Sequence, residues 1–152
     1  MKPHRTDGID PAARSRARRR ALQALYAWQL SDSPVERVIE NFRAEQDMEV
    51  ADLEYFEALV RGVAEHLGPI DAVLARYIDR EIAQVDPIER AVLRIAGYEL
   101  AHRLDVPYRV VINEAIETTK RFGAEHGHTY VNGVLDRAAA EWRAAEIAGG
   151  RR

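Results

Sequence analysis

The sequence contains no cysteine. This absence excludes disulfides, thiolate metal sites and cysteine nucleophiles, and it fits a reducing compartment. The chain also lacks any apolar run near the roughly 20 residues that a membrane-spanning helix needs. Its basic N-terminal segment is not followed by the apolar stretch of a signal peptide. We therefore expect a cytoplasmic protein with no membrane association.

The motifs of common enzyme classes are also missing. The sequence has no glycine-rich phosphate loop, no nucleophile elbow and no zinc-protease helix. His126 and His128 are two residues apart, so they would point in different directions on a helix, and no further ligand lies nearby in sequence. Asn113 and Glu114 lack a motif partner for acid–base chemistry. We therefore expect no metal, no cofactor and no enzymatic activity.

Charge is unevenly spread over the 152 residues. Residues 1–30 hold seven basic and two acidic side chains, whereas the rest of the chain holds fifteen basic and twenty-three acidic ones. The net charge of −3 therefore combines a basic start with an acidic body. This asymmetry predicts that a polyanion docks in one orientation, and the acidic body suits a basic protein partner.

An arginine cluster stands just before the first apolar helical stretch. It consists of Arg14, Arg16, Arg18, Arg19 and Arg20. The first turn of a helix carries partial positive charge, so guanidinium groups are unfavourable there, and no acidic residue occurs between Pro11 and Ser31 to compensate for them. A solvated charge run is one explanation. Because the run contains only arginine, we favour a second explanation, an anion-binding site for nucleic-acid phosphate.

Apolar residues recur at helical spacing through most of residues 11–148. The segment 88–104 is apolar on more than one face, which is typical of a central helix contacted from several sides. The only β-branched run, residues 110–112, is too short for a strand. We predict an all-α fold of about seven helices in one domain, with a flexible arm at 1–10 and a frayed tail at 149–152.

A segment rich in glycine and histidine precedes the last apolar helix. Tyr130 lies one position off the buried stripe, so we expect its ring to be partly exposed. It is either a tyrosine at the edge of the core or a ring on which an RNA base stacks. Asn132 would read a base edge or cap the loop. Gly133 inside a helix costs about 1 kcal/mol relative to alanine, which suggests close approach by another helix or a ligand.

Four segments together resemble the NusB family, in the order that the family has them. They are residues 21–30 (ALQALYAWQL), 89–96 (ERAVLRIA), 105–116 (DVPYRVVINEAI) and 122–136, which contains YVNGVLD. The resemblance covers nearly the whole chain, and the INEAIE and YVNGVLD signatures are its most specific parts. The arginine cluster before the first core helix also fits the family.

The resemblance implies an all-helical fold of two packed helical subdomains and no enzymatic activity. NusB-like proteins pair with NusE, a small-subunit ribosomal protein, and the pair binds the boxA element of nascent RNA. With further Nus factors, this assembly makes RNA polymerase resist termination, notably on ribosomal RNA operons. The resemblance thus implies single-stranded, boxA-like RNA and NusE as direct partners, and other Nus factors and RNA polymerase as indirect ones.

The arginine cluster and the resemblance together give the expected site residues. The expected RNA contacts are Arg14, Arg16, Arg18, Arg19, Tyr130 and Asn132. The residues expected at the NusE interface are Tyr26, Glu89 and Arg90. By position, Tyr130 takes the place of an RNA-contacting Phe. The chain departs from the family pattern at Thr129, where a Lys or Arg is usual, and at His126, in a stretch that is normally more acidic.

Three other functions are weighed against this one. An acidic adaptor that binds a basic protein without touching RNA would leave the arginines to solubility alone. An RNA-modifying enzyme is disfavoured: NusB-like domains are also fused to ribosomal RNA methyltransferases, but this chain has no room for a cofactor-binding sheet. DNA binding is disfavoured as well, because no helix-turn-helix spacing is evident.

Overall fold

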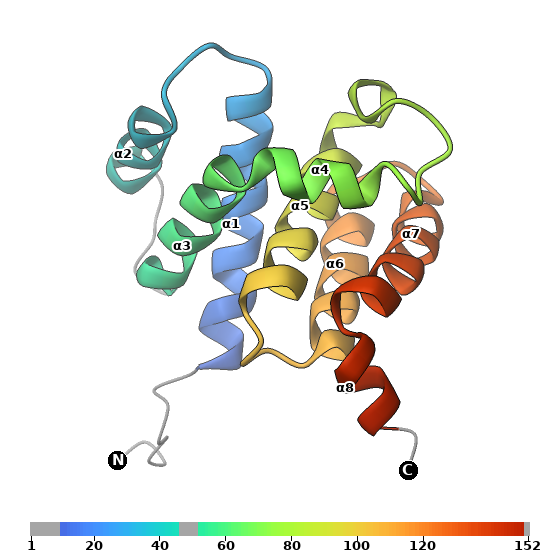
Figure 1. Ribbon diagram of the computed structural model, residues 1–152. Helices are drawn as coiled ribbons and strands as arrows, with labels where there is room; N and C mark the ends of the chain where they lie inside the picture. The colour runs from blue at the N-terminus through green and yellow to red at the C-terminus, as the bar shows by residue number, and fades with distance from the viewer. Residues whose placement is uncertain (1–9, 46–51, 151–152) are drawn as a thin grey trace, which may run out of the picture.

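The computed structural model describes residues 10–45 and 52–150. Over these residues the chain forms eight α-helices and one short 3-10 helix, with no strand (Figure 1). The elements are α1 (Pro11–Gln29), α2 (Val35–Glu45), α3 (Leu53–Glu65), α4 (Leu67–Leu74), η1 (Ile82–Gln84), α5 (Pro87–His102), α6 (Tyr108–Phe122), α7 (Gly127–Trp142) and α8 (Ala144–Gly149). The predicted all-α class is confirmed, and the short α8 adds one helix to the expected seven.

Helix α5 lies at the centre of the fold and joins two packed groups of helices. It packs against α1, α3 and α4 of one group and against α6 and α7 of the other (Figure 1). Nine of its residues are buried, and these include Leu93 and Leu100. Asp86 caps its start by accepting from the backbone N–H groups of Ile88 and Glu89 at 3.0 and 3.2 Å. The predicted central helix and the two helical subdomains are both present.

Helix α1 begins with an acidic cap that the sequence analysis did not anticipate. The Asp10 carboxylate accepts from the backbone N–H groups of Ala12 and Ala13 at 3.1 and 3.3 Å, so an anion does sit at the positive end of this helix. The buried face of α1 includes Leu22 and Leu25. Leu30, which the helical spacing predicts on the same apolar stripe, is instead 58% exposed beyond the last turn.

Two helix starts differ from what the sequence predicts, since Gly68-Pro69 is typical of a helix end and the glycine- and histidine-rich segment before the last helix is typical of a loop. Gly68 and Pro69 lie inside the first turn of α4 and do not end α3, because the first N–H groups of a helix need no intrahelical partner and therefore tolerate proline. Helix α7 begins at Gly127, directly after His126, whose φ of 69° is left-handed. Tyr130 therefore lies in the first turn of a helix rather than in a loop.

The predicted arm and tail fall mainly on residues 1–9 and 151–152, which lie outside the described residues. Asp10, which we assigned to the arm, is the cap of α1, and Gly149, which we assigned to the tail, is the last residue of α8. Within the described ranges, no helix is both long and apolar enough to cross a membrane.

Candidate nucleic-acid interface

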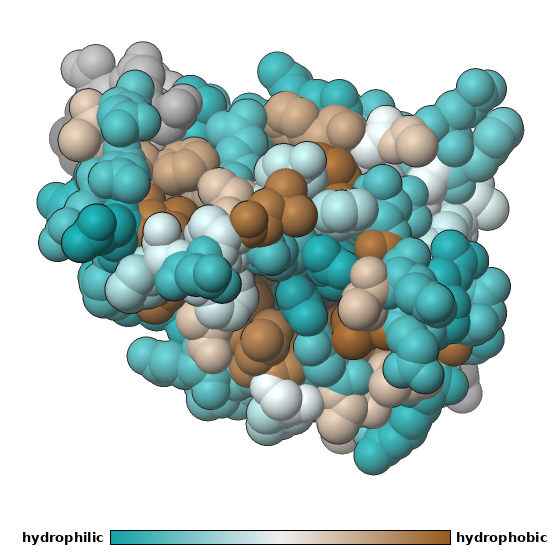
Figure 2. All heavy atoms as spheres, turned by 90° about the horizontal axis from the view of Figure 1, so that it is seen from above, coloured by the Kyte–Doolittle hydropathy of each residue, from teal (hydrophilic) through white to brown (hydrophobic). Residues whose placement is uncertain are grey.

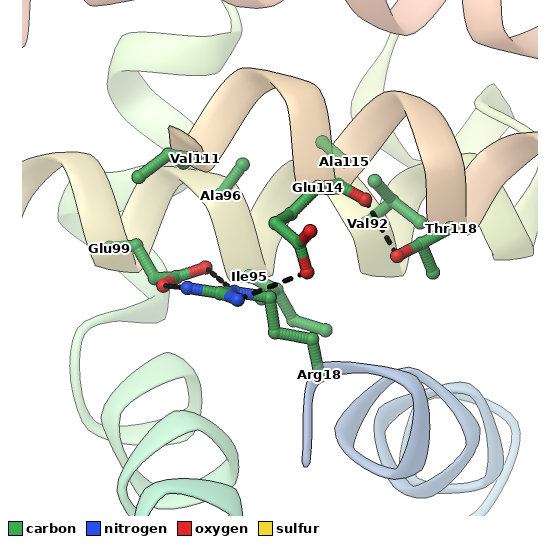
Figure 3. A pocket seen from close by; sticks show the side chains of 9 residues that line it. All are labelled: Arg18, Val92, Ile95, Ala96, Glu99, Val111, Glu114, Ala115 and Thr118. Carbon is green, nitrogen blue, oxygen red and sulfur yellow. Dashed lines mark hydrogen bonds and ion pairs between the residues drawn. The ribbon is translucent and has the colours of Figure 1, made fainter. Parts of the chain in front are cut away.

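Arg18 lies in the core rather than on the surface. Its side chain points between α5 and α6 and is held by two carboxylates (Figure 3). It donates to both oxygens of Glu99 at 2.8 to 3.1 Å and to Glu114 at 3.1 Å. Arg18 is 5% exposed and Glu99 1% exposed. Burial alone would lower the pKa of Arg18, but Glu99 more than offsets this effect and the pKa is raised.

Arg14 continues this internal network one helical turn earlier. Its guanidinium lies 4.1 Å from the centre of the Tyr55 ring and forms an ion pair with Asp105 at 3.4 Å. The hydroxyl of Tyr55 in turn donates a short hydrogen bond to Glu99. Arg103 stacks on the same ring at 4.8 Å. We call Arg14 and Arg18 the inner arginines, because the protein's own acids and the Tyr55 ring hold both of them.

This arrangement corrects two expectations from the sequence. The arginine cluster does have acidic partners, but they come from other helices, 81 and 96 residues further along the chain for Arg18. An RNA contact at Arg18 does not fit its position, because its guanidinium is buried and its donors are used inside the protein. Arg14, with 12% of its side chain exposed, offers little more surface.

The other arginines of the cluster lie closer to the surface. Arg16, Arg19 and Arg20 are each partly exposed. Burial lowers the pKa of Arg19, and the charge of Arg121 on α6 lowers it further. Arg16 and Arg20 add to this repulsion, and Glu114 opposes it. Arg19 therefore lies among like charges, and it stays a candidate for contact with an anion.

Tyr130 occupies the start of α7 together with a residue that the sequence analysis missed. Arg80, from the segment before η1, places its guanidinium 4.8 Å from the centre of the Tyr130 ring. The same arginine is paired with Asp79 at 2.7 Å. Burial raises the pKa of Tyr130, its hydroxyl is buried, and the Asp79 carboxylate beside it raises the pKa further. The guanidinium of Arg80 thus covers part of the Tyr130 ring. A nucleobase could stack on the same ring beside the guanidinium or in its place.

Glu89 lies against the same end of α7. It is 8% exposed, and a Cβ atom added to Gly127 would lie 2.6 Å from its carboxylate, so a larger residue there would require the Glu89 side chain to move. Burial raises the pKa of Glu89, Asp86 raises it further, and Arg80 acts in the opposite direction. Asn132, two residues after Tyr130, is half-buried on α7. The structure therefore brings together Tyr130, expected at RNA, and Glu89, expected at the protein partner.

Of the two other expected partner residues, Arg90 lies at a hollow where α1 ends and α5 begins. Arg90 lines this hollow of about 500 Å³ with Trp28 and Ile82, and it donates to the backbone carbonyls of Ile82 and Ala83. Tyr26 is exposed on the last turns of α1. Figure 2 shows apolar patches between polar atoms on the face seen from above. Such a mixed surface suits a protein partner.

The expected RNA residues do not form one compact patch. The start of α1, with the inner arginines, lies at the lower edge of Figure 1, whereas the connection between α6 and α7 lies towards the opposite edge. Arg80 gave no signal in the sequence, because only the fold places it on Tyr130. Gly133 has no atom within 4 Å of where a Cβ would stand, so the helix contact that we suggested for it is not present.

Possible metal ligands do not gather in the described parts of the chain, where no group of three or more His, Asp or Glu side chains could hold an ion. His126 is exposed at the cap of α7 and His128 lies in its first turn. The features that the structure does show define a small all-helical protein. Two clusters in which an arginine covers a tyrosine ring lie at the start of α1, around Tyr55, and at the start of α7, around Tyr130.

The chain belongs to the NusB family, whose model matches residues 15–140. The transcription antitermination protein NusB of Stenotrophomonas maltophilia (strain K279a) is 66% identical over 145 residues, which cover 95% of this chain and 91% of that protein. Its counterpart from Xanthomonas axonopodis pv. citri (strain 306) is 67% identical over 142 residues, covering 93% of this chain and 89% of that protein. The predicted family is confirmed.

Solved structures agree with this assignment. T. maritima NusB is 36% identical, has a TM-score of 0.74, and is aligned over 84% of this chain and 90% of its own. A crystal structure of antitermination factors NusB and NusE in complex with dsRNA has a TM-score of 0.77 at 24% identity, over 84% of this chain and 96% of the matched one. At that identity, the second likeness shows the fold alone.

Proposed function

We propose that this protein is a non-enzymatic transcription antitermination factor of the cytoplasm that pairs with the ribosomal protein NusE and binds boxA-type single-stranded RNA. In this role it supports transcription of ribosomal RNA operons, together with other Nus factors and RNA polymerase. Family membership supports the proposal. The observation on this chain that supports it most is the Tyr130 ring under Arg80, beside Glu89 at the start of α7.

The chemistry of this site suits RNA and a basic protein together. Single-stranded bases stack on aromatic rings and on guanidinium planes, while phosphates meet cations. Tyr130 and Arg80 supply the first kind of contact, and the outer side of α1 supplies the second. Glu89 is an acidic group that a basic ribosomal protein would approach at the same end. Arg16, Arg19, Tyr130 and Asn132 stay proposed RNA contacts, and Tyr26, Glu89 and Arg90 stay proposed partner contacts.

The test is an RNA-binding titration of the full chain, with and without NusE, on a boxA strand and a scrambled strand of equal length. A double-stranded boxA arm belongs in the experiment, because a related NusB–NusE structure contains dsRNA. The proposal predicts that the complex with NusE prefers the boxA single strand and that its affinity falls as salt rises. Equal affinity for the boxA and scrambled strands would contradict the proposed specificity.

One observation favours a second candidate, an acidic adaptor that binds a basic protein without touching RNA. The protein's own carboxylates neutralise the inner arginines, so these side chains need no external anion. The candidates separate when Arg16 and Arg19 are both replaced by alanine. The RNA-binding protein loses RNA affinity and keeps NusE, whereas the adaptor shows no RNA affinity to lose.

A further inference from the structure

A polar groove runs between α1 and α6. Its volume is about 430 Å³, and basic side chains reach it from both helices: Arg19 from α1, and Lys120 and Arg121 from the last turn of α6. Glu114 and Glu117 also line it. Two acidic and three basic side chains therefore line the groove.

The acids of the groove leave positive charge in excess. Glu114 already accepts from Arg18 at 3.1 Å and from the Ser15 hydroxyl at 2.6 Å. Glu117 pairs only with Lys120, at 3.6 Å, and both side chains are well exposed, so this pair is weak. Across the described ranges, neither Arg19 nor Arg121 forms an ion pair with an acidic side chain. We call these two residues the groove arginines.

Structural roles explain only part of this arrangement. Cations are favourable in the last turn of a helix, which accounts for Lys120 and Arg121 at the end of α6. It does not account for the position of Arg19, because Arg121 faces it from the neighbouring helix and the two charges repel each other. The inner arginine Arg18 lies one residue before Arg19 on the same helix and is fully neutralised. The groove arginines therefore lack the carboxylate partners that the fold supplies to Arg18.

The position of the groove matters as much as its charge. Arg121 is separated from Glu114, beside Arg18, by seven residues of α6, which is about 10 Å along a helix axis. It is the last residue but one of α6, and the connection that follows leads through His126 to α7, which carries Tyr130. The groove lies between α1 and α6. The start of α1 lies beside one end of α6 and the start of α7 follows its other end (Figure 1), so the groove lies between the two groups of expected RNA contacts.

We infer that the groove between α1 and α6 is a phosphate-binding site for the RNA strand, with Arg19 and Arg121 as its ligands and Lys120 at its rim. The strand then passes along α6 from the outer side of α1 to Tyr130. This inference rests on the proposed RNA-binding function and adds the path that the strand takes. Guanidinium groups from two helices suit a phosphate, because each offers forked N–H donors to its oxygens.

A contact of this kind positions RNA without reading its sequence. Losing one phosphate contact should therefore weaken boxA and scrambled strands by the same factor and leave their ratio unchanged. For a single strand, each contact contributes about 0.7 to the slope of log affinity against log salt. At 0.1 M salt, the loss of one contact corresponds to roughly fivefold weaker binding.

The experiment titrates RNA onto the complex with NusE at several salt concentrations, for wild type, Arg121→Ala, Arg121→Lys and Arg37→Ala. Arg37 is an exposed arginine on α2, away from the groove, and serves as the control. We expect Arg121→Ala to weaken both strands about fivefold and to reduce the slope by about 0.7. Arg121→Lys keeps the slope, because it keeps the charge, and Arg37→Ala changes nothing.

Thermal unfolding of the same variants separates binding from folding. Arg121 repels Arg19 but is favourable in the last turn of α6. Because these two effects oppose each other, Arg121→Ala should unfold close to the wild-type temperature, so weaker RNA binding would not come from a damaged fold. If wild type binds RNA and Arg121→Ala keeps both its affinity and its slope, the groove is not a phosphate site. If the wild-type complex binds neither strand, the proposed function fails, and this inference fails with it.

Discussion

Two buried glutamates of helix α5 differ in whether the protein's own side chains pair with their carboxylates. Glu99 is 1% exposed and receives three hydrogen bonds from Arg18 and one from Tyr55. Glu89, ten residues earlier, is 8% exposed, and no hydrogen bond to its carboxylate is present among the described residues. Burial raises its pKa with little compensation from Arg80. The carboxylate of Glu99 is therefore neutralised by the protein's own side chains, whereas that of Glu89 is not.

The arginines repeat this contrast. The inner arginines are bound by the protein's own carboxylates, whereas the groove arginines face each other across an open groove. A buried ion pair contributes little net stability but is costly to break, because the remaining charge is left buried alone. An unbalanced cation at the surface is available to an outside anion. The comparison therefore assigns the inner arginines to folding and the groove arginines to binding.

The largest expected effect is on the inner end. Arg18→Ala leaves Glu99 charged and buried without its partner, which should reduce the free energy of unfolding by about 3–5 kcal/mol. Chemical denaturation with urea measures this loss. Arg19→Ala, one residue further on the same helix, is the matched control and should change stability by less than about 0.5 kcal/mol. Equal losses in the two variants would remove the distinction between inner and groove arginines.

The next largest effect concerns RNA at the other end. Tyr130→Ala removes a stacking platform worth about 1–3 kcal/mol per base, so RNA affinity of the complex with NusE should fall between roughly fivefold and a hundredfold. Tyr130→Phe keeps the ring and deletes only a buried hydroxyl beside Asp79, so it should bind like wild type. Fluorescence anisotropy with labelled RNA gives both affinities. Strong loss in the Phe variant would show that the ring is not the contact.

A smaller effect follows from the unpaired carboxylate. Because the pKa of Glu89 is raised in the folded protein, folding disfavours its ionised form, and this cost is present above the folded pKa and absent below the ordinary value of 4.5. Glu89→Gln should therefore unfold at a higher temperature than wild type at pH 7. The gain should disappear as the pH falls below 4.5. Thermal unfolding across pH checks this, and a gain that persisted in acid would point to another cause.

The Glu89→Gln variant also tests whether this carboxylate takes part in partner binding. If a basic partner supplies the missing compensation, Glu89→Gln should bind NusE more weakly while it is more stable alone. Glu99→Gln, in contrast, should lose stability, because it weakens a satisfied pair. Unchanged NusE binding in Glu89→Gln would separate this carboxylate from the partner site.

The smallest effect is expected at Gly133. Its position is open and helical, with no atom within 4 Å of the place that an added Cβ atom would occupy, so Gly133→Ala should stabilise the protein by up to about 1 kcal/mol. A matching loss of RNA or NusE affinity would mean that a ligand approaches the backbone there. Equal affinity would leave helix propensity as the only effect of this glycine.

Much of the fold could be predicted from the sequence because it depends on local patterns. Helical spacing gave the helices, and the apolar faces of residues 88–104 identified α5 as the central helix. The order Asp86-Pro87-Ile88-Glu89 is itself typical of a helix start, and Asp86 caps α5, because capping acts within a few residues. The predicted boundaries were wrong at α4 and α7, where a proline tolerated in a first turn and a left-handed residue at a helix start decide the outcome.

The candidate site was harder to predict, because its key contacts join distant parts of the chain. Arg18 meets Glu99 across 81 residues, and Arg80 meets Tyr130 across 50. One signal was available: Arg18 precedes Leu22 and Leu25 by four and seven residues, which places it on the buried stripe of α1. A charged residue on such a stripe indicates a buried partner rather than a surface contact.

The most direct test replaces the inner pair by apolar side chains of similar size, as in the double variant Arg18→Met with Glu99→Leu. Such replacements keep buried sites folded in other proteins, so the variant removes an arginine of the cluster without leaving Glu99 charged and buried; Glu114 keeps its hydrogen bond from Ser15. Its RNA affinity in complex with NusE is the decisive measurement. The account predicts an affinity within about twofold of wild type, whereas a loss of about tenfold or more, roughly 1.4 kcal/mol, would show that Arg18 itself serves RNA binding.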